Sequence, residues 1–189
     1  MKRPSVLVCL VALVVMLCTA AAEKASTGKF KYVGVKSCRS CHSSRKIGRQ
    51  YQAWKKSPHA EGYEVLATSE AKGIADSLDI DDPQKHARCL ECHITAFGVG
   101  PERLARALTV KSGIGCEGCH GPGEAYAVLG MMRAAASGTQ DPAEIGLITK
   151  PPNGVCASCH NDRSPTYRPF TYGEAARKIA HPRPKARNP

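Results

Sequence analysis

Apolar residues in this chain come in short clusters at helical spacing, and glycine and proline separate the clusters. Almost no stretch alternates apolar and polar residues as a half-buried strand would. The pattern predicts a mainly α protein, with short helices and irregular loops. The expected helices and helical turns are Ile47 to Lys56, one from Pro58 to Thr68, one from an N-cap at Ser69 to Leu78, one from Asp82-Pro83 into Cys89, Glu102 to Leu108, Glu124 to Ala136, a turn from Asp141, and Gly173 to Ala180.

The one long apolar run stands at the start of the chain. Lys2 and Arg3 precede apolar residues from Val6 to Leu17, and small residues follow up to Ala22. This arrangement is typical of a secretory signal cleaved after Ala22, and the run is shorter than the about 20 residues that span a bilayer. We expect a signal peptide at 1–22, a polar, loose arm as far as Val33, one domain at 23–181, a basic, disordered tail at 182–189, and no membrane span.

A five-residue pattern, Cys-x-x-Cys-His, occurs four times. In each copy the two thiols can add across the vinyl groups of one haem, and the imidazole that follows can reach the iron of that haem. Four copies predict four covalently bound haem c groups wrapped by one small multihaem domain. The haem-binding cysteines are Cys38, Cys41, Cys89, Cys92, Cys116, Cys119, Cys156 and Cys159, and the iron ligands are His42, His93, His120 and His160.

Zinc sites and redox disulfides also use Cys-x-x-Cys pairs. A zinc module joins two half-sites across roughly 15 to 20 residues, but 47, 23 and 36 residues separate successive copies here. A redox disulfide does not need a histidine after its second cysteine. Neither chemistry explains the histidine in every copy, so the motifs favour haem.

The other cysteines and the charge add to this picture. Of ten cysteines, only Cys9 and Cys18 stand outside the motifs, both in the expected signal, so none is left for a disulfide. A lipid anchor on Cys18 is the alternative to cleavage, which bulky Leu17 disfavours. The formal charge is +11, but each haem brings two propionates that offset it. Because the basic residues are spread along the chain and aromatic residues make up 5%, nucleic acid is not an expected partner.

Few side chains remain that could complete the coordination of the irons. Outside the motifs there are three histidines, His59, His86 and His181, and after the signal only two methionines, Met131 and Met132. Surface histidines and packed methionines are the alternatives to ligation. Four macrocycles in so short a chain should form most of its core, so we expect the apoprotein not to fold.

The order of motifs resembles the tetrahaem cytochrome c-554 family. The shared residues include Trp54 and Ser57-Pro58-His59 after the first motif, Phe97-Gly98 after the second, and Pro169-Phe170-Thr171 before a late histidine. The third block, Gly113-Ile-Gly-Cys-Glu-Gly-Cys-His-Gly-Pro-Gly123, is the most specific. The resemblance covers nearly the whole chain after the signal.

The resemblance implies three six-coordinate haems and a second haem with one open face. His59 would then be the distal ligand opposite His160, and His181 the one opposite His120. The family has a histidine eleven residues after the third motif, where this chain has Met131. A thioether there would raise the potential of the first haem, with Met132 as the fallback.

The resemblance gives an expected role to Pro169 and Phe170, and the place of His86 in the sequence gives one to that histidine. Pro169 and Phe170 resemble the apolar lining of the open pocket beside the second haem. His86 stands three residues before Cys89, too near the anchored side to cross its own ring, so a propionate partner or a surface residue is preferred to a ligand.

Two functions fit these sites. The first is a periplasmic electron-transfer protein that passes single electrons through four haems between redox proteins that act as donor and acceptor. The alternative is a haem enzyme that reduces a small nitrogen oxide bound at the open second haem. Such an enzyme needs a proton source, and only Arg168 and Tyr172 flank the pocket residues, so the carrier is preferred. A haem-bearing subunit that scaffolds a larger complex is a third possibility.

Overall fold

The computed structural model describes residues 28–182. The expected signal peptide and all but the first residue of the expected tail lie outside the described residues. The helices are α2 (Val35–His42), α3 (Gln50–Lys55), α4 (Ser69–Asp76), α5 (Ala87–His93), α6 (Cys116–His120), α7 (Leu129–Ser137), α8 (Asn153–Ala157) and α9 (Tyr172–Ile179). Five 3-10 turns accompany them: η1 (Pro58–Glu61), η2 (Glu64–Ala67), η3 (Pro101–Arg103), η4 (Val110–Ser112) and η5 (Ala143–Ile145).

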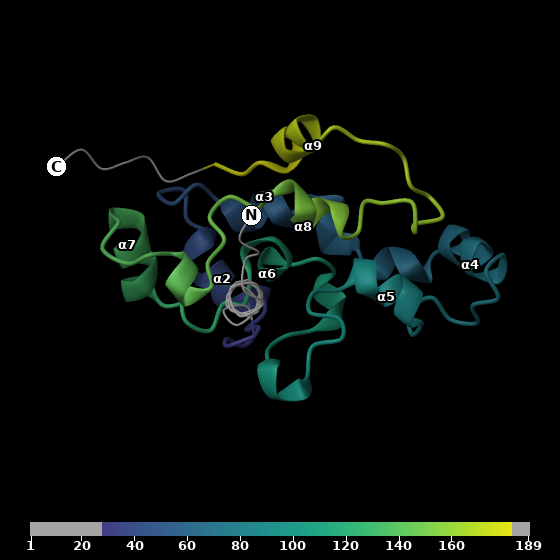
Figure 1. The fold of residues 1–189 in the computed structure, drawn as a ribbon, viewed down its shortest axis with the longest axis horizontal. Helices are drawn as coiled ribbons and strands as arrows, with labels where there is room; N and C mark the ends of the chain where they lie inside the picture. The colour runs from purple at the N-terminus through teal and green to yellow at the C-terminus, as the bar shows by residue number, and fades with distance from the viewer. Residues whose placement is uncertain (1–27, 183–189) are drawn as a thin grey trace, which may run out of the picture.

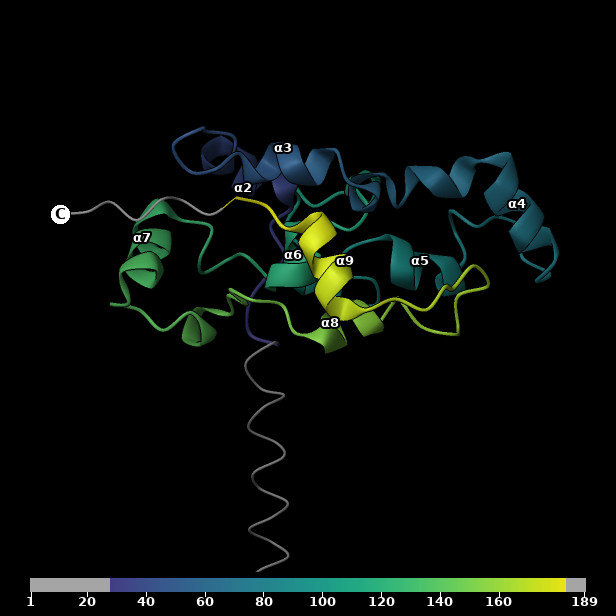
Figure 2. The same ribbon diagram turned by 90° about the horizontal axis from the view of Figure 1, so that it is seen from above.

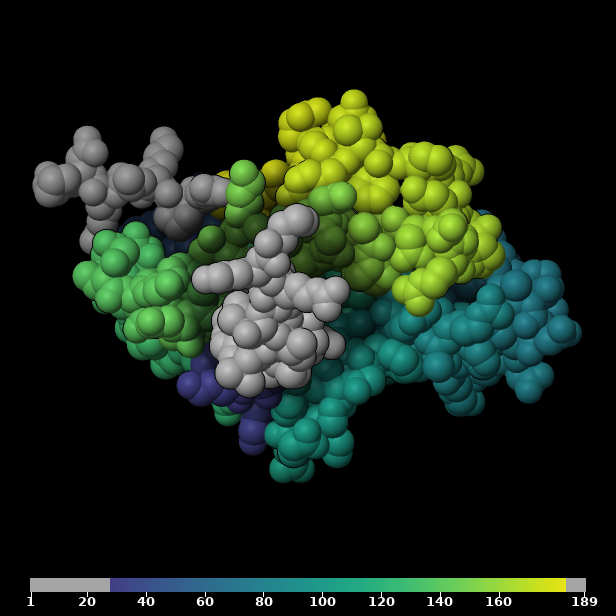
Figure 3. Space-filling model, in the orientation of Figure 1, coloured from purple at the N-terminus to yellow at the C-terminus, as the bar shows by residue number. Residues whose placement is uncertain are grey.

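The helices are strung along one long axis. Figures 1 and 2 place α7 at one end and α4 at the other, with α2, α6, α8 and α5 between them. The C-terminal segment with α9, yellow in Figure 3, forms the upper edge of the molecule in that view. Within 28–182, β pairing is confined to one isolated bridge between Tyr32 and Leu104. The prediction of a mainly α chain with irregular loops is confirmed.

The apolar core of the polypeptide is very small. Among the described residues, no large side chain is fully buried, and the buried hydrophobic residues are Val35, Leu66, Ala75, Ile80, Tyr126 and Ile145. The eight motif cysteines are half-buried and form no disulfide with one another. A body of this length normally buries a larger core, so the packing leaves room for bulky groups at the cysteines.

The segment before α2 is ordered by contacts with distant loops. The N–H of Tyr32 donates to the carbonyl of Arg103 at 2.8 Å, and the N–H of Ala105 donates back to Tyr32 at 2.9 Å. Lys31 and Glu124 exchange two further bonds, of 3.0 and 3.1 Å. The prediction of a loose arm is therefore wrong for residues 28–33.

These contacts also explain two helices that are shorter than predicted. The helix expected at 102–108 is reduced to η3, because residues 103–105 pair with Tyr32. The helix expected from Glu124 begins only at Leu129, because Glu124 is bound to Lys31. Long-range pairing overrides helical propensity at both places.

Two helix starts also differ from the prediction. Thr68 rather than Ser69 caps α4, and its hydroxyl accepts from the N–H of Ala71 at 3.2 Å. Asp82 makes a local turn by accepting from the N–H of Gln84 at 2.9 Å, so α5 starts only at Ala87. Side-chain bonds of this kind favour caps and turns over helix interiors.

Of the four remaining predicted elements, one is wrong and three are present. The helix expected from Pro58 to Thr68 is replaced by the two tight turns η1 and η2. The helices expected at Ile47 to Lys56 and at Gly173 to Ala180 are present as α3 and α9, and η5 is the turn expected after Asp141.

Candidate functional site

The four motifs are presented by helices or by the turn that ends one. The first, second and third end at the last residue of α2, α5 and α6, and the fourth runs from α8 into a turn in which the N–H of His160 donates to the carbonyl of Cys156 at 2.9 Å. Residues three and four apart share one face of a helix. The two thiols and the imidazole of each motif therefore face the same side, as bonding to one macrocycle requires.

Three motif histidines are oriented by a hydrogen bond at Nδ1. His93 Nδ1 lies 2.6 Å from the carbonyl oxygen of Gly62, and His120 Nδ1 lies 2.6 Å from that of Ile148. His42 Nδ1 lies 3.2 Å from Gln50 Oε1. An oxygen acceptor at Nδ1 keeps the proton there and leaves Nε2 free to bind a metal.

Gln50 is a residue that sequence reasoning missed. It is 8% exposed, and its side-chain amide donates to the carbonyls of Pro182, at 2.8 Å, and Ile47, while its oxygen faces His42. The amide thus joins the first motif to the residue after His181. No motif signals this role, because a glutamine at the start of a helix is common in many contexts.

The structure brings His59 to His160. Their ring centres lie 6.0 Å apart, with an angle of 88° between the ring planes. His59 lies in η1, and its carbonyl accepts from the N–H of Ile114 at 2.9 Å, which holds it beside the third block. Burial, and next the charge of His160, lowers the pKa of His59, so its imidazole favours the neutral form that binds metals.

A second pair joins the third motif to the end of the chain. The ring centres of His120 and His181 lie 5.8 Å apart, with 43° between the planes. Burial, and next the charge of His120, lowers the pKa of His181. His181 stands two residues after α9, and α9 lies over the middle of the molecule (Figures 1 and 2).

Both ring separations fit a haem iron between the imidazoles. A metal–imidazole bond is about 2.0 Å long, so two such bonds place the coordinating nitrogens about 4 Å apart. Each ring centre lies about 1 Å beyond its nitrogen, which gives about 6 Å between centres. This spacing fits a haem iron. The eight half-buried motif thiols, which form no disulfide among the described residues, are available for thioether bonds to haem.

Contacts between cysteines of different motifs set the order of the motifs in space. Cys38 lies within hydrogen-bonding reach of Cys116, which together with burial raises the pKa of the Cys38 thiol. Burial and then Cys159 raise the pKa of Cys92 to about 11, and the charge of Cys156 acts on Cys119. The first motif thus adjoins the third, the third adjoins the fourth, and the fourth adjoins the second.

Glycines of the third block allow backbone segments to touch. Gly113 has φ +56, and a Cβ there would lie 2.5 Å from the carbonyl oxygen of His59. Gly121 has φ +80, and a Cβ there would lie 2.5 Å from the carbonyl oxygen of Gly146. Only glycine fits both the conformation and the space, so the block positions His59 as well as the third motif.

Glu117, inside the third motif, is a second residue that sequence reasoning missed. Its side chain is 4% exposed. Its oxygens accept from the N–H groups of Val33 at 2.8 Å, Gly34 at 2.7 Å and Gly123 at 2.7 Å. This carboxylate fastens the start of α2 to the third motif. A carboxylate between the two cysteines of a motif was the available signal.

The remaining candidate residues lie at separate places. Met131 and Met132 are half-buried in the first turn of α7. The Phe170 ring lies 5.1 Å from that of His160, at 56°, while Pro169 is exposed. His86 is the N-cap of α5, where its Nδ1 accepts from the N–H of Arg88 at 3.3 Å.

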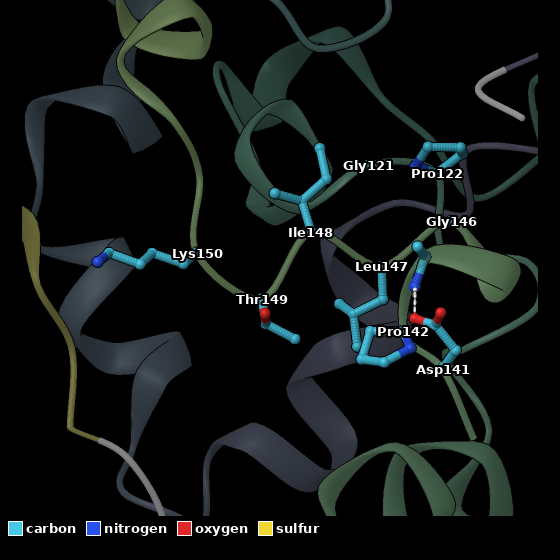
Figure 4. A pocket seen from close by; sticks show the side chains of 10 residues that line it. Gly121, Pro122, Asp141, Pro142, Gly146, Leu147, Ile148, Thr149 and Lys150 are labelled. Carbon is cyan, nitrogen blue, oxygen red and sulfur yellow. Dashed lines mark hydrogen bonds between the residues drawn. The ribbon is translucent and has the colours of Figure 1, made fainter. Parts of the chain in front are cut away.

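A cavity of about 490 Å³ adjoins the third motif. Figure 4 shows its lining, which extends from Pro122 and Gly146 at one end through Ile148 to Lys150 at the other. The cavity borders His120 through the carbonyl of Ile148, the partner of its Nδ1. Its size is in the range of cavities that hold small ligands and cofactors. Within residues 28–182, no helix is both long enough and apolar enough to pass through a bilayer.

Comparisons with known proteins agree with this reading of the motifs. Residues 37–121 match the family model described as cytochrome c554 and c-prime. Cytochrome c-554 of Nitrosomonas europaea is 31% identical over 99 residues, which are 50% of this chain and 40% of that protein. The chain thus covers less than half the length of this relative. No solved structure matches the chain.

The matched segment contains three of the four motifs, the paired residue His59, and Gly113 and Gly121 of the third block. Proteins with this motif bind haem c through thioether bonds. The segment 37–121 is thus similar to the cytochrome c-554 family.

Proposed function

We propose that this protein is a four-haem electron carrier that passes single electrons between two redox proteins. The observation that carries the proposal is the pairing of His59 with His160 and of His120 with His181, at 6.0 and 5.8 Å. Each pair joins one motif histidine to a histidine from a distant element, at a spacing that suits an iron with two axial imidazoles. Fully coordinated irons favour electron transfer over chemistry at the metal.

The ligands follow from these pairs and from the family pattern. The third haem takes His120 and His181, and the fourth takes His160 and His59. The first takes His42 and Met131, on α2 and α7, which Figures 1 and 2 place toward the same end of the molecule. His93 would hold the second haem, whose other face would stay open. By the family pattern Pro169 and Phe170 would line that face, although the Phe170 ring contacts His160 of the adjoining fourth motif.

When bound, each haem supplies a one-electron couple between ferrous and ferric iron. The polypeptide sets the environment of that couple. The oxygens of Gln50, Gly62 and Ile148 hold a proton on Nδ1 of their histidines, which makes Nε2 a stronger donor. The motif order from first through third and fourth to second follows the long axis, so the two terminal motifs lie toward opposite ends.

We place the protein in the bacterial periplasm, where c-type haem is attached. The basic and apolar start of the sequence supports export by a cleaved signal. The donor and acceptor are then periplasmic redox proteins.

An experiment on the purified ferric holoprotein tests the proposal against the enzyme alternative. Absorption and EPR spectra are recorded with and without nitric oxide, and reduction by dithionite is followed by stopped flow. A carrier accepts one electron per haem and passes all of them to an added oxidant, and nitric oxide at the open haem is bound without turnover. Catalytic consumption of a nitrogen oxide at the rate of electron supply would instead favour the enzyme.

A further inference from the structure

Acidic and basic residues are divided unevenly between parts of the described chain. Residues 28–60 contain nine Lys and Arg and no Asp or Glu, whereas residues 61–91 contain eight Asp and Glu and three Lys and Arg. The expectation that basic residues are spread along the chain overlooked this division, because it did not consider where the acidic residues stand. Most of the basic residues of the first segment also lie near one another in the folded structure.

Seven of these nine cations are exposed on α2, on α3 and on the loop between them. Figures 1 and 2 show the two helices next to each other, away from the α4 end. None of the three ion pairs among the described residues includes any of the seven. We call this set the cationic face, and its members are Lys36, Arg39, Arg45, Lys46, Arg49, Lys55 and Lys56.

Exposed Glu61 stands in η1, which packs on α3, but it belongs to none of the ion pairs among residues 28–182. Two further carboxylates approach the same part of the chain without neutralising this face. Glu117 is buried and accepts from backbone N–H groups of Val33 and Gly34. Glu124 accepts from the backbone N–H of Lys31 at 3.0 Å. Both carboxylates therefore bind the backbone of the segment before α2, and not the side chains of the cationic face. The two propionates of a haem at the first motif would still leave about five positive charges.

Repulsion between these exposed cations raises the free energy of the protein when no partner is bound. Exposed like charges closer than the Debye length, about 8 Å at physiological ionic strength, repel one another. A partner with an acidic face removes that repulsion and is steered to the surface, which raises association rates by 10- to 1,000-fold. The first motif stands on α2, the helix that also carries Lys36 and Arg39. It is at one end of the motif order, so a partner docked on this helix meets that terminal haem first.

We propose that the cationic face is the docking surface for a redox protein with an acidic face, and that electrons are exchanged with it at the first motif. The proposal rests on the carrier function and adds to it the class of partner and the terminal haem involved.

The test compares two charge reversals of equal size. Lys55→Glu with Lys56→Glu changes the cationic face. Lys85→Glu with Arg88→Glu changes two exposed cations at the start of α5, of which Lys85 pairs with Asp82 at 2.8 Å. Each holoprotein is mixed with a reduced plant-type [2Fe–2S] ferredoxin, an acidic donor, and the second-order rate of haem reduction is measured at low and high ionic strength. We expect the first pair to slow reduction about 10-fold or more at low ionic strength and the control by less than about twofold. The difference should vanish in high salt.

Other outcomes separate the docking proposal from the carrier function. Equal rates for both double variants, or an equal loss in both, would overturn the docking surface while leaving the carrier intact. Loss of binding to phosphatidylglycerol vesicles in the first pair, with unchanged ferredoxin kinetics, would overturn it in favour of a lipid surface. A wild-type protein that dithionite reduces fully but that exchanges no electrons with ferredoxin or with a basic one-haem cytochrome would overturn the carrier function itself.

Discussion

The imidazoles of His59 and His160 face each other across 6.0 Å, although they come from opposite halves of the chain. The polypeptide itself secures this relationship, because the carbonyl of His59 accepts from Ile114 and lies against Gly113 of the third block. The proposed ligand of the fourth haem is thus held by the segment that carries the third motif. The third block therefore links two expected haem sites, in addition to carrying the third motif.

Replacing His59 tests the coordination of the fourth haem. In His59→Ala the iron opposite His160 should lose its sixth ligand and become high-spin, because alanine supplies no donor. EPR of the ferric holoprotein should then gain one high-spin haem relative to the wild type. The matched control is His86→Ala, which removes an N-cap but no proposed ligand. An identical low-spin content in wild type and His59→Ala would contradict the assignment.

Replacing Met131 tests the ligand of the first haem. Met131→His should lower one midpoint potential and abolish any thioether absorption band at the red edge of the visible spectrum, because imidazole favours ferric iron more than a thioether does. Met132→His, one residue further along α7, should do neither. Redox titration of both variants and the wild type measures this. Superimposable titrations for wild type and Met131→His would rule out thioether ligation at that residue.

The buried carboxylate of Glu117 should contribute strongly to stability. Glu117→Ala leaves two buried N–H groups, of Gly34 and Gly123, and the part-buried N–H of Val33 without an acceptor. At about 1–3 kcal/mol for each buried group this should cost about 2 kcal/mol or more. Glu117→Gln keeps one oxygen and should cost less. Guanidinium unfolding of the holoprotein, followed by circular dichroism, measures the differences. The control is Glu124→Ala, whose single exposed bond to Lys31 should be worth less than about 1 kcal/mol. Equal losses in Glu117→Ala and Glu124→Ala would refute this ranking.

Tyr126 should make the fold sensitive to alkali. Burial, and next the charge of Glu117, raises the pKa of Tyr126 above its ordinary value of about 10. Because folding raises this pKa, protonated Tyr126 contributes its full stabilisation below about pH 10. That contribution is lost as the pH rises toward the pKa of Tyr126 in the folded state. Tyr126→Phe removes this titration but also a hydrogen bond to Gly121, worth about 1 kcal/mol. Unfolding free energies between pH 8 and 11 should therefore fall less steeply in Tyr126→Phe, and parallel curves would show that Tyr126 does not titrate on unfolding.

The motifs and the helical class were predictable because both rest on local spacing. Cys-x-x-Cys-His places its two thiols and its imidazole on one side of a helical turn, and α3 and α9 follow from their own apolar periodicity. The partners of His59 and His181 came from the family pattern and not from spacing, since nothing local links them to His160 or His120.

The features that sequence reasoning missed depend on contacts between distant segments. Tyr32 pairs with the loop around Leu104 and thereby prevents a helix there. Glu117 and Gln50 each join two segments through side-chain hydrogen bonds. Local pattern cannot reveal such bonds, because they depend on which chain segments meet in the folded molecule.

The central claim is that four haem groups are covalently bound to this chain through its eight motif cysteines. Mass spectrometry of the denatured, exported protein tests it most directly, because thioether bonds survive denaturation. We predict a mass equal to that of the chain from Glu23 to Pro189 plus four haems, with a haem absorption band that stays with the polypeptide. A folded product with the mass of its polypeptide alone, or with fewer than four haems per chain, would contradict the account.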